Sequence, residues 1–83
     1  MLSKGIRGAI TVDENTVESI HSATIELITE LVRQNKIKPE MISHVIFTLT
    51  PDLNAEFPAK FARCECGWDK VAMMCFHELD VPN

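Results

Sequence analysis

Residues 50–68 carry the side chains best suited to bind a small anion. Lys60 and Arg63 lie three positions apart, so on a helix they share one face. Phe57 precedes them and offers an apolar wall beside the two charges. Two fixed cations next to an aromatic ring predict a site for a small ligand that carries two negative charges.

The local sequence indicates that Lys60 and Arg63 do lie on a helix. Pro58 fixes φ for a first helical turn, and Gly67 suits the position just past a helix end. Pro51 ends the element that comes before. We therefore expect a short helix between Pro58 and Gly67.

Arg7 is a third candidate anion binder, on a predicted strand over residues 4–12. The alternating pattern places Arg7 on the same face as the small residues Gly5 and Ala9, which leave open volume around the guanidinium. A ligand could enter that volume. An arginine on the wet face of an edge strand would give the same pattern, so both readings stay open.

Other groups of reactive side chains fit a site less well. A zinc site could use Cys64, Cys66, Cys75 and His77, but structural zinc sites generally use cysteines separated by two to four residues. Buried or partly buried thiols explain the cysteines better. A catalytic thiolate at Cys75 lacks a third group to orient His77.

Glu78 follows a strand of apolar residues and is either a carboxylate at the mouth of a covered site or a solvated loop residue. His21 and His44 have no Cys, Ser or carboxylate at motif spacing, so we expect them at the surface. Met73 and Met74 are interpreted as core filler.

The hydropathy pattern orders these candidates along a single domain, residues 1–83, in which strands and helices alternate. The predicted order is β-α-β-α-β. The elements are a strand over 4–12, a helix within 12–36, a strand over 43–50, the short helix, and a strand over 70–76.

The long helix has the clearest signal. Apolar residues recur on a 3.6-residue stripe, made of Val17, Ile20, Leu27, Ile28 and Leu31. Asn15 is its predicted N-cap, with Glu18 three residues later as in a capping box. The strand over 43–50 is almost wholly apolar or Thr, which is typical of a central strand covered on both faces.

Composition restricts the class of protein. The net charge of −4 disfavours general nucleic-acid binding, which requires a basic surface. No stretch reaches the roughly 18 apolar residues of a membrane span, and residues 1–7 lack the apolar region of a signal peptide. Three cysteines, an odd number, fit a reducing cytoplasm.

Three blocks of sequence resemble one family. They are GIRGA at 5–9 followed by Thr11 and Val12, TPDLNAEFPAK at 50–60 followed by Arg63 and Gly67-Trp68, and Cys75 followed by Glu78-x-Asp80-Val81. In this order they resemble the AroH class of monofunctional chorismate mutases. The similarity runs in register from about Lys4 to Val81.

The resemblance implies an isomerase that converts chorismate to prephenate, on the shikimate route to phenylalanine and tyrosine. The family uses no metal, cofactor or covalent intermediate. It holds the substrate in its reactive shape and places positive charge beside the breaking ether bond.

The resemblance also assigns roles. Arg7 would bind a substrate carboxylate, Glu78 would accept a hydrogen bond from the ring hydroxyl, and Cys75 would line the site. Met74 stands where the family contributes backbone contacts. A neighbouring subunit would supply the wall and the positive mouth of the pocket, formed by Phe57, Ala59, Lys60 and Arg63.

The resemblance implies an α+β fold, with a mixed β-sheet and helices packed on it. The family forms a homotrimer, a pseudo-α/β-barrel with active sites at the subunit interfaces. Two further strands follow the position of Asn83 in the family, and they carry an arginine for the ether oxygen and a tyrosine. We therefore expect the domain to be incomplete at its C-terminus and weakly active by itself. The alternative is a non-catalytic oligomeric protein of the same fold that binds small anions.

Overall fold

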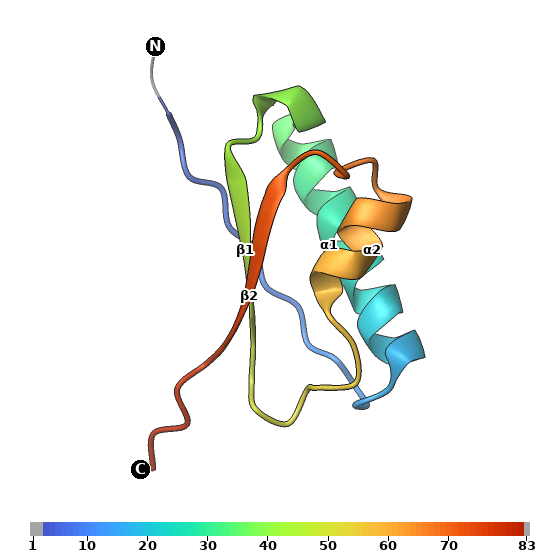
Figure 1. The fold of residues 1–83 in the computed structure, drawn as a ribbon, viewed down its shortest axis with the longest axis vertical. Coiled ribbons are helices and arrows are strands. Elements are labelled where there is room, and N and C mark those ends of the chain that lie inside the picture. Colours follow the sequence, from blue (N-terminus) through green and yellow to red (C-terminus); the bar gives the residue numbers. More distant parts are fainter. Residues whose placement is uncertain (1–2, 83) are drawn as a thin grey trace.

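The computed structural model describes residues 3–82. Its elements follow the order α1 (Val17–Asn35), a 3₁₀ turn η1 (Pro39–Met41), β1 (His44–Leu49), α2 (Pro58–Glu65) and β2 (Ala72–His77). The two helices lie side by side on one side of a two-stranded sheet (Figure 1). The predicted α+β class is confirmed.

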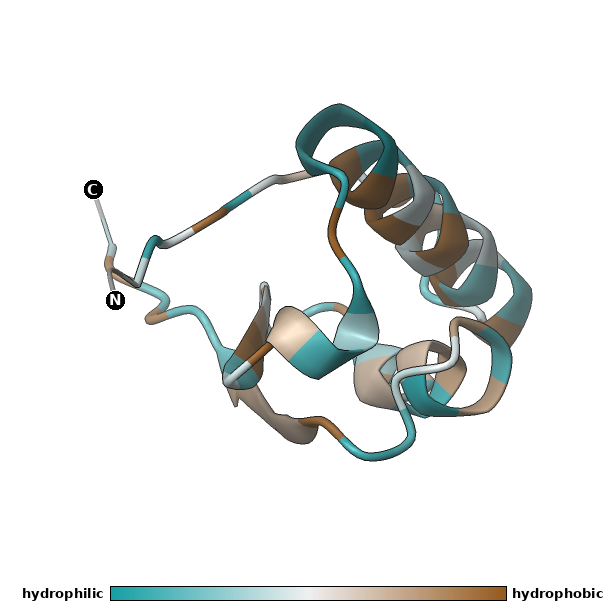
Figure 2. Ribbon diagram, turned by 90° about the horizontal axis from the view of Figure 1, so that it is seen from above, coloured by the Kyte–Doolittle hydropathy of each residue, from teal (hydrophilic) through white to brown (hydrophobic). Residues whose placement is uncertain are grey.

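Helix α1 forms where the apolar stripe predicted it, but a different residue caps it. The Thr16 hydroxyl accepts a hydrogen bond from the Ser19 N–H, 3.1 Å away, so Thr16 and not Asn15 is the N-cap. Lys36 ends the helix in the left-handed region at φ 51°. Polar and apolar bands alternate along α1 in Figure 2, and Ile20, Ala23, Thr24 and Ile28 are its buried residues.

Asn15 instead ties the start of α1 to the loop before α2. Its Oδ1 accepts hydrogen bonds from the backbone N–H groups of Asn54 and Ala55, each at 2.9 Å. Its Nδ2 donates to Oδ1 of Asn54 at 2.8 Å. The capping prediction was wrong because the side chain has a partner about forty residues away in the sequence.

Strands β1 and β2 pair in parallel, and α2 forms the connection between them. The register runs from His44 opposite Ala72 to Leu49 opposite His77. A parallel pair needs a crossover connection of this kind, and a helix usually supplies it. Both strands lie close to their predicted positions.

The sheet packs its inner face on both helices. The core contains Ile28 of α1, Ala62 of α2 and Trp68, and partly buried side chains of the sheet pack against it, among them Val45, Phe47 and Met73. Every second residue of the strands therefore faces the helices.

The outer face of the sheet is exposed, so the prediction that β1 is covered on both faces is wrong for this chain. Ile46 is 52% exposed, Met74 57% and Phe76 45%. The helices described between residues 3 and 82 all cover the other face.

The predicted strand over 4–12 is not formed. Residues 3–12 are extended coil, and none of them makes a backbone hydrogen bond to another described residue. Alternation makes an extended chain possible, but a strand also needs a partner for its N–H and C=O groups. The segment passes close to α1, since a Cβ placed on Gly8 would lie 3.0 Å from Cδ2 of Leu31 and 3.1 Å from Cδ1 of Leu27.

Candidate functional site

A hollow of about 320 Å³ lies against α2 and the inner side of β2. We call it the α2–β2 hollow. Its lining consists of Glu56, Phe57, Ala59, Lys60, Arg63, Met73 and Cys75. Five of these residues were site candidates from the sequence. The resemblance assigned Cys75 and the other four to different subunits, whereas all five line this hollow within one chain.

Helix α2 provides most of this lining because its two faces differ. Phe61 and Ala62 are buried against α1 and the core, which turns Lys60 and Arg63 outward. Pro58 stands in the first turn, as predicted, and Gly67 follows the helix at φ 76°, a backbone conformation that glycine adopts readily.

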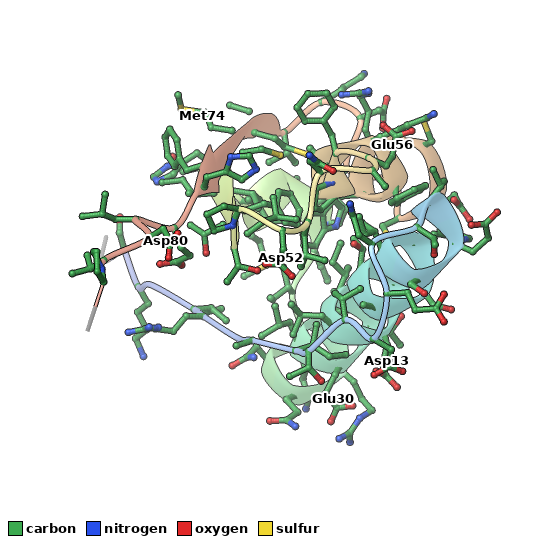
Figure 3. All side chains as sticks on the ribbon, turned by 90° about the horizontal axis from the view of Figure 1, so that it is seen from below. Asp13, Glu30, Asp52, Glu56, Met74 and Asp80 are labelled. Carbon is green, nitrogen blue, oxygen red and sulfur yellow. The ribbon has the colours of Figure 1, made fainter. Side chains whose placement is uncertain are left out.

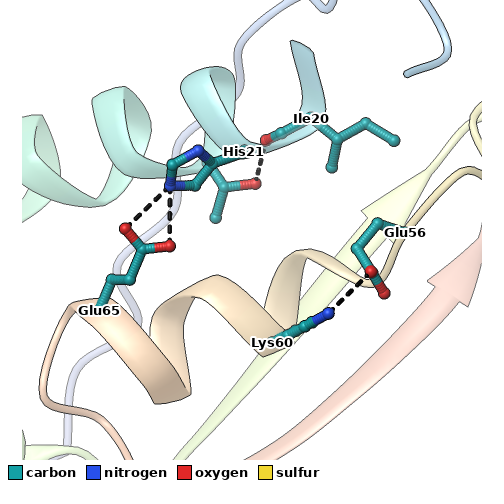
Figure 4. A network of polar contacts seen from close by, with 6 residues as sticks. Ile20, His21, Glu56, Lys60 and Glu65 are labelled. Carbon is teal, nitrogen blue, oxygen red and sulfur yellow. Dashed lines mark hydrogen bonds and ion pairs between the residues drawn. The ribbon is translucent and has the colours of Figure 1, made fainter. Parts of the chain in front are cut away.

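A contact with α1 fixes the position of α2. Nε2 of His21 lies 2.8 Å from Oε2 of Glu65 (Figure 4). The His21 ring is also tilted against Phe61, with ring centroids 4.6 Å apart. His21 therefore makes a structural contact between the two helices.

Phe57 stands at the N-terminal end of α2 and is 66% exposed. Such exposure is unusual for a large aromatic side chain, because its burial normally contributes to stability. The ring forms part of the wall of the hollow and is available to an apolar part of a ligand.

The charges on the hollow are two cations and one carboxylate. Nζ of Lys60 lies 3.1 Å from Oε2 of Glu56 (Figure 4). Oε1 of Glu56 accepts a hydrogen bond from the Phe57 N–H at 3.1 Å. This backbone hydrogen bond and, after it, the contact with Lys60 lower the pKa of Glu56, so its carboxylate is ionised at neutral pH. Arg63 has no carboxylate partner among residues 3–82.

Strand β2 contributes the opposite side of the hollow through Met73 and Cys75. Met74, between them, has its side chain on the outer face of the sheet, away from α1 (Figure 3). The core-filler interpretation is therefore wrong for Met74, whose side chain is 57% exposed, and confirmed for Met73, which packs against the core. The backbone contacts that the resemblance implies for Met74 stay a prediction.

Arg7 and Glu78 do not line the hollow of their own chain. Arg7 is exposed on the extended segment before α1. Glu78 has an exposed side chain just after β2, and its backbone N–H donates to the carbonyl of Leu49 at 2.6 Å. The single chain therefore brings together the candidates of α2 and β2 but not these two.

Sequence reasoning did not identify Glu56 or Met73 as lining residues. A signal for Glu56 existed, since a glutamate four residues before a lysine commonly pairs with it on a helical turn. Met73 had no comparable signal, because alternation alone does not say which face of a strand borders a cavity.

The zinc alternative finds no support in the arrangement of the cysteines. Cys64 is exposed, and burial followed by the charge of Glu65 raises the pKa of the Cys66 thiol. Within residues 3–82, no three His, Cys, Asp or Glu side chains are close enough together to hold a metal ion.

In the same range, no helix combines the length and apolar character needed to cross a membrane.

Comparison with known proteins places the chain in a family. The family model "Chorismate mutase type I" matches residues 3–83. The chain belongs to this family. The AroH-class resemblance read from the three sequence blocks is confirmed.

Two curated relatives are both named chorismate mutase AroH. The relative from Bacillus subtilis (strain 168) is 42% identical over 81 residues, which cover 98% of this chain and 64% of the relative. The relative from Thermus thermophilus is 46% identical over 81 residues, with 96% and 66% covered. The chain thus spans slightly less than two thirds of the length of either relative.

A solved structure confirms the fold. The chorismate mutase from Clostridium thermocellum superposes with a TM-score of 0.81 at 42% identity, over 88% of this chain and 64% of the other. The two proteins are therefore similar both in sequence and in the path of the backbone.

Proposed function

We propose that this chain acts as a chorismate mutase, an isomerase that rearranges chorismate to prephenate in the biosynthesis of aromatic amino acids. Family membership and the names of the two curated relatives support the proposal. The observation that carries it is the pair of cations on one face of α2, Lys60 and Arg63, beside the exposed ring of Phe57 on one hollow.

This lining suits a unimolecular rearrangement. The substrate carries two carboxylates, for which Lys60 and Arg63 are suitable partners because hydrogen bonds between charged groups are the strong ones. The reaction needs a bound shape and positive charge near the ether oxygen, and it needs no nucleophile. Ala59 and Cys75 are small lining residues that leave room for a ring.

Arg7 and Glu78 belong to the proposed site through a neighbouring copy of the chain. Each is exposed and outside the hollow of its own chain. We propose that Arg7 binds a substrate carboxylate and that Glu78 accepts a hydrogen bond from the ring hydroxyl in the hollow of the neighbour. Met74 would contribute its backbone only.

A homotrimer is the proposed assembly, in the cytoplasm. The uncovered apolar face of the sheet, formed by Ile46, Met74 and Phe76, supports an assembly, since contiguous exposed apolar surface commonly marks an interface. Sites shared between subunits would bring Arg7 and Glu78 to the hollow.

The test compares Arg63→Ala with Arg33→Ala in an assay of chorismate consumption and prephenate formation. Arg33 is the matched control, because it pairs with Glu30 on α1 and does not line the hollow. Loss of a hydrogen bond to a charged group costs about 1.5–3 kcal/mol, so Arg63→Ala should lower kcat/KM roughly 10- to 150-fold. Arg33→Ala should leave kcat/KM unchanged.

Mixing chains tests the shared site. Arg7→Ala and Arg63→Ala chains, allowed to exchange subunits, should recover activity beyond either parent, because some mixed sites carry neither substitution. No recovery after confirmed exchange would contradict shared sites. Chorismate binding without prephenate formation by the unsubstituted chain would favour the non-catalytic binding protein instead.

A further inference from the structure

Glu56 is the one acidic side chain among the residues that line the α2–β2 hollow. Its side chain is only 20% exposed, and both carboxylate oxygens have partners. Oε1 accepts from the Phe57 N–H and Oε2 lies against Nζ of Lys60, each at 3.1 Å. The Glu56 carboxylate therefore occupies one of the positions from which a carboxylate of a ligand can bind Lys60.

We propose that Glu56 determines ligand specificity as a built-in counter-anion, which pairs with Lys60 until a second carboxylate of a ligand replaces it. This inference deepens the proposed function, because it concerns the same hollow and the same class of dianionic ligand. In the empty hollow Arg63 is the cation without a carboxylate partner among the described residues.

The charges give the direction of the effect. A ligand with one carboxylate binds at Arg63 and leaves the contact between Glu56 and Lys60 intact. A ligand with two carboxylates needs Lys60 as well, so it competes with Glu56 for the ammonium group and binds close to the negative charge of Glu56. Glu56 thus weakens the binding of dianions more than that of monoanions.

Two features hold Glu56 ready for this exchange. The Phe57 N–H belongs to the N-terminal end of α2, where the helix dipole favours a negative charge. Glu56 therefore keeps one partner when Lys60 turns to a ligand. The Lys60 side chain is about half exposed, at 51%, so it can change partner without disturbing the core.

The test uses Glu56→Gln with Glu30→Gln as the matched control. Both substitutions remove one negative charge and one partner of an ion pair, but Glu30 pairs with Arg33 on α1, away from the hollow. The probes are succinate, with two carboxylates, and acetate, with one. Their dissociation constants are measured by calorimetric or NMR titration at neutral pH and constant ionic strength.

Glu56→Gln should bind succinate about two- to fivefold more tightly than the unsubstituted chain, as expected for the loss of an exposed ion pair that competes with the ligand. The gain for acetate should be smaller, and Glu30→Gln should change neither constant. The proposal is overturned if Glu56→Gln binds succinate no more tightly than Glu30→Gln does, if both probes gain equally, or if succinate does not bind.

A second test uses the unsubstituted chain, so its outcome does not depend on whether a variant folds. Saturation with succinate should shift the carboxyl ¹³C signal of Glu56, because Lys60 leaves it, whereas acetate should not. A Glu56 signal that is unmoved by bound succinate refutes the exchange. Neither probe is chorismate, so failure to form prephenate would refute the catalytic proposal alone, whereas these titrations decide the role of Glu56.

Discussion

Asn15 is predicted to stabilise the loop that leads into the hollow. Its side chain makes three hydrogen bonds across the chain, two accepted from the N–H groups of Asn54 and Ala55 and one donated to Asn54. Asn15→Ala removes all three. Because Asn15 is exposed, each bond is taken at the lower end of the usual range, about 0.5 kcal/mol, which gives a loss of about 1.5 kcal/mol.

Urea unfolding followed by circular dichroism measures this loss. In a domain of this size, about 1.5 kcal/mol corresponds to a fall of about 6–12 °C in Tm. Amide hydrogen exchange should also become faster at Asn54 and Ala55, whose N–H groups lose their acceptor. Faster exchange confined to these two positions would locate the effect in the loop.

Asn15→Asp is the matched control. An aspartate keeps an oxygen that accepts from both N–H groups, and its negative charge is favourable near the start of α1. It cannot make the bond that Asn15 donates to Oδ1 of Asn54, so we expect its stability to lie about 0.5 kcal/mol below that of the unsubstituted chain, one third of the loss in Asn15→Ala. If Asn15→Asp loses as much stability as Asn15→Ala, the two hydrogen bonds that Asn15 accepts do not cause the loss, and the reasoning is refuted.

Two further predictions concern packing and pH. Gly8→Ala should lower the free energy of unfolding by about 1–2 kcal/mol, because the new Cβ would lie 3.0 Å from Cδ2 of Leu31. Gly5→Ala is the control, because its Cβ would meet open space, and it should be neutral or slightly stabilising. Urea unfolding of both variants measures the difference. The Glu30 carboxylate accepts hydrogen bonds from Arg33, which has the larger effect, and from Gln34. These hydrogen bonds lower the pKa of Glu30 from 4.5 to about 2. The stability that this pair contributes is therefore present above pH 4.5 and lost as the pH falls toward 2, and an NMR titration with a Glu30 midpoint near 4.5 would contradict it.

Local signals were sufficient for the helices and for both observed strands. Pro58 and Gly67 act through their own backbone restrictions, so they set the ends of α2 without reference to the rest of the chain. The apolar stripe of α1 likewise depends on helical geometry alone. The α+β class came from the family resemblance, because the alternating order of the segments by itself is equally typical of an α/β fold.

The N-terminal segment shows what local signals omit. Residues 4–12 alternate as a strand does, but the hydrogen bonds that would make it a strand have to come from another segment. The same holds for Asn15 and Thr16, two neighbouring residues that are both capable of capping. The distant loop at Asn54 engages the first, and only the second is left to cap α1.

The candidate site was predictable to a similar extent. Lys60 and Arg63 were found because they share a helix with its own sequence signals, and the tertiary fold then brought Cys75 opposite them. Glu56 was missed because its importance depends on where the carboxylate points. Arg7 and Glu78 remain predictions, since one chain does not bring them to the hollow.

Helix α2 contributes one face to the core and the other to the proposed site. Ala62 is fully buried against the core, and its neighbour Arg63 faces the hollow. Because α2 is a short helix of eight residues, a displacement of its buried face also displaces its outward face. A larger side chain at Ala62 would push α2 away from α1 and would move Lys60 and Arg63 relative to Cys75 on β2. A substitution at Ala62 would therefore alter the hollow without touching a ligand, because close packing transmits the displacement from one face of the helix to the other.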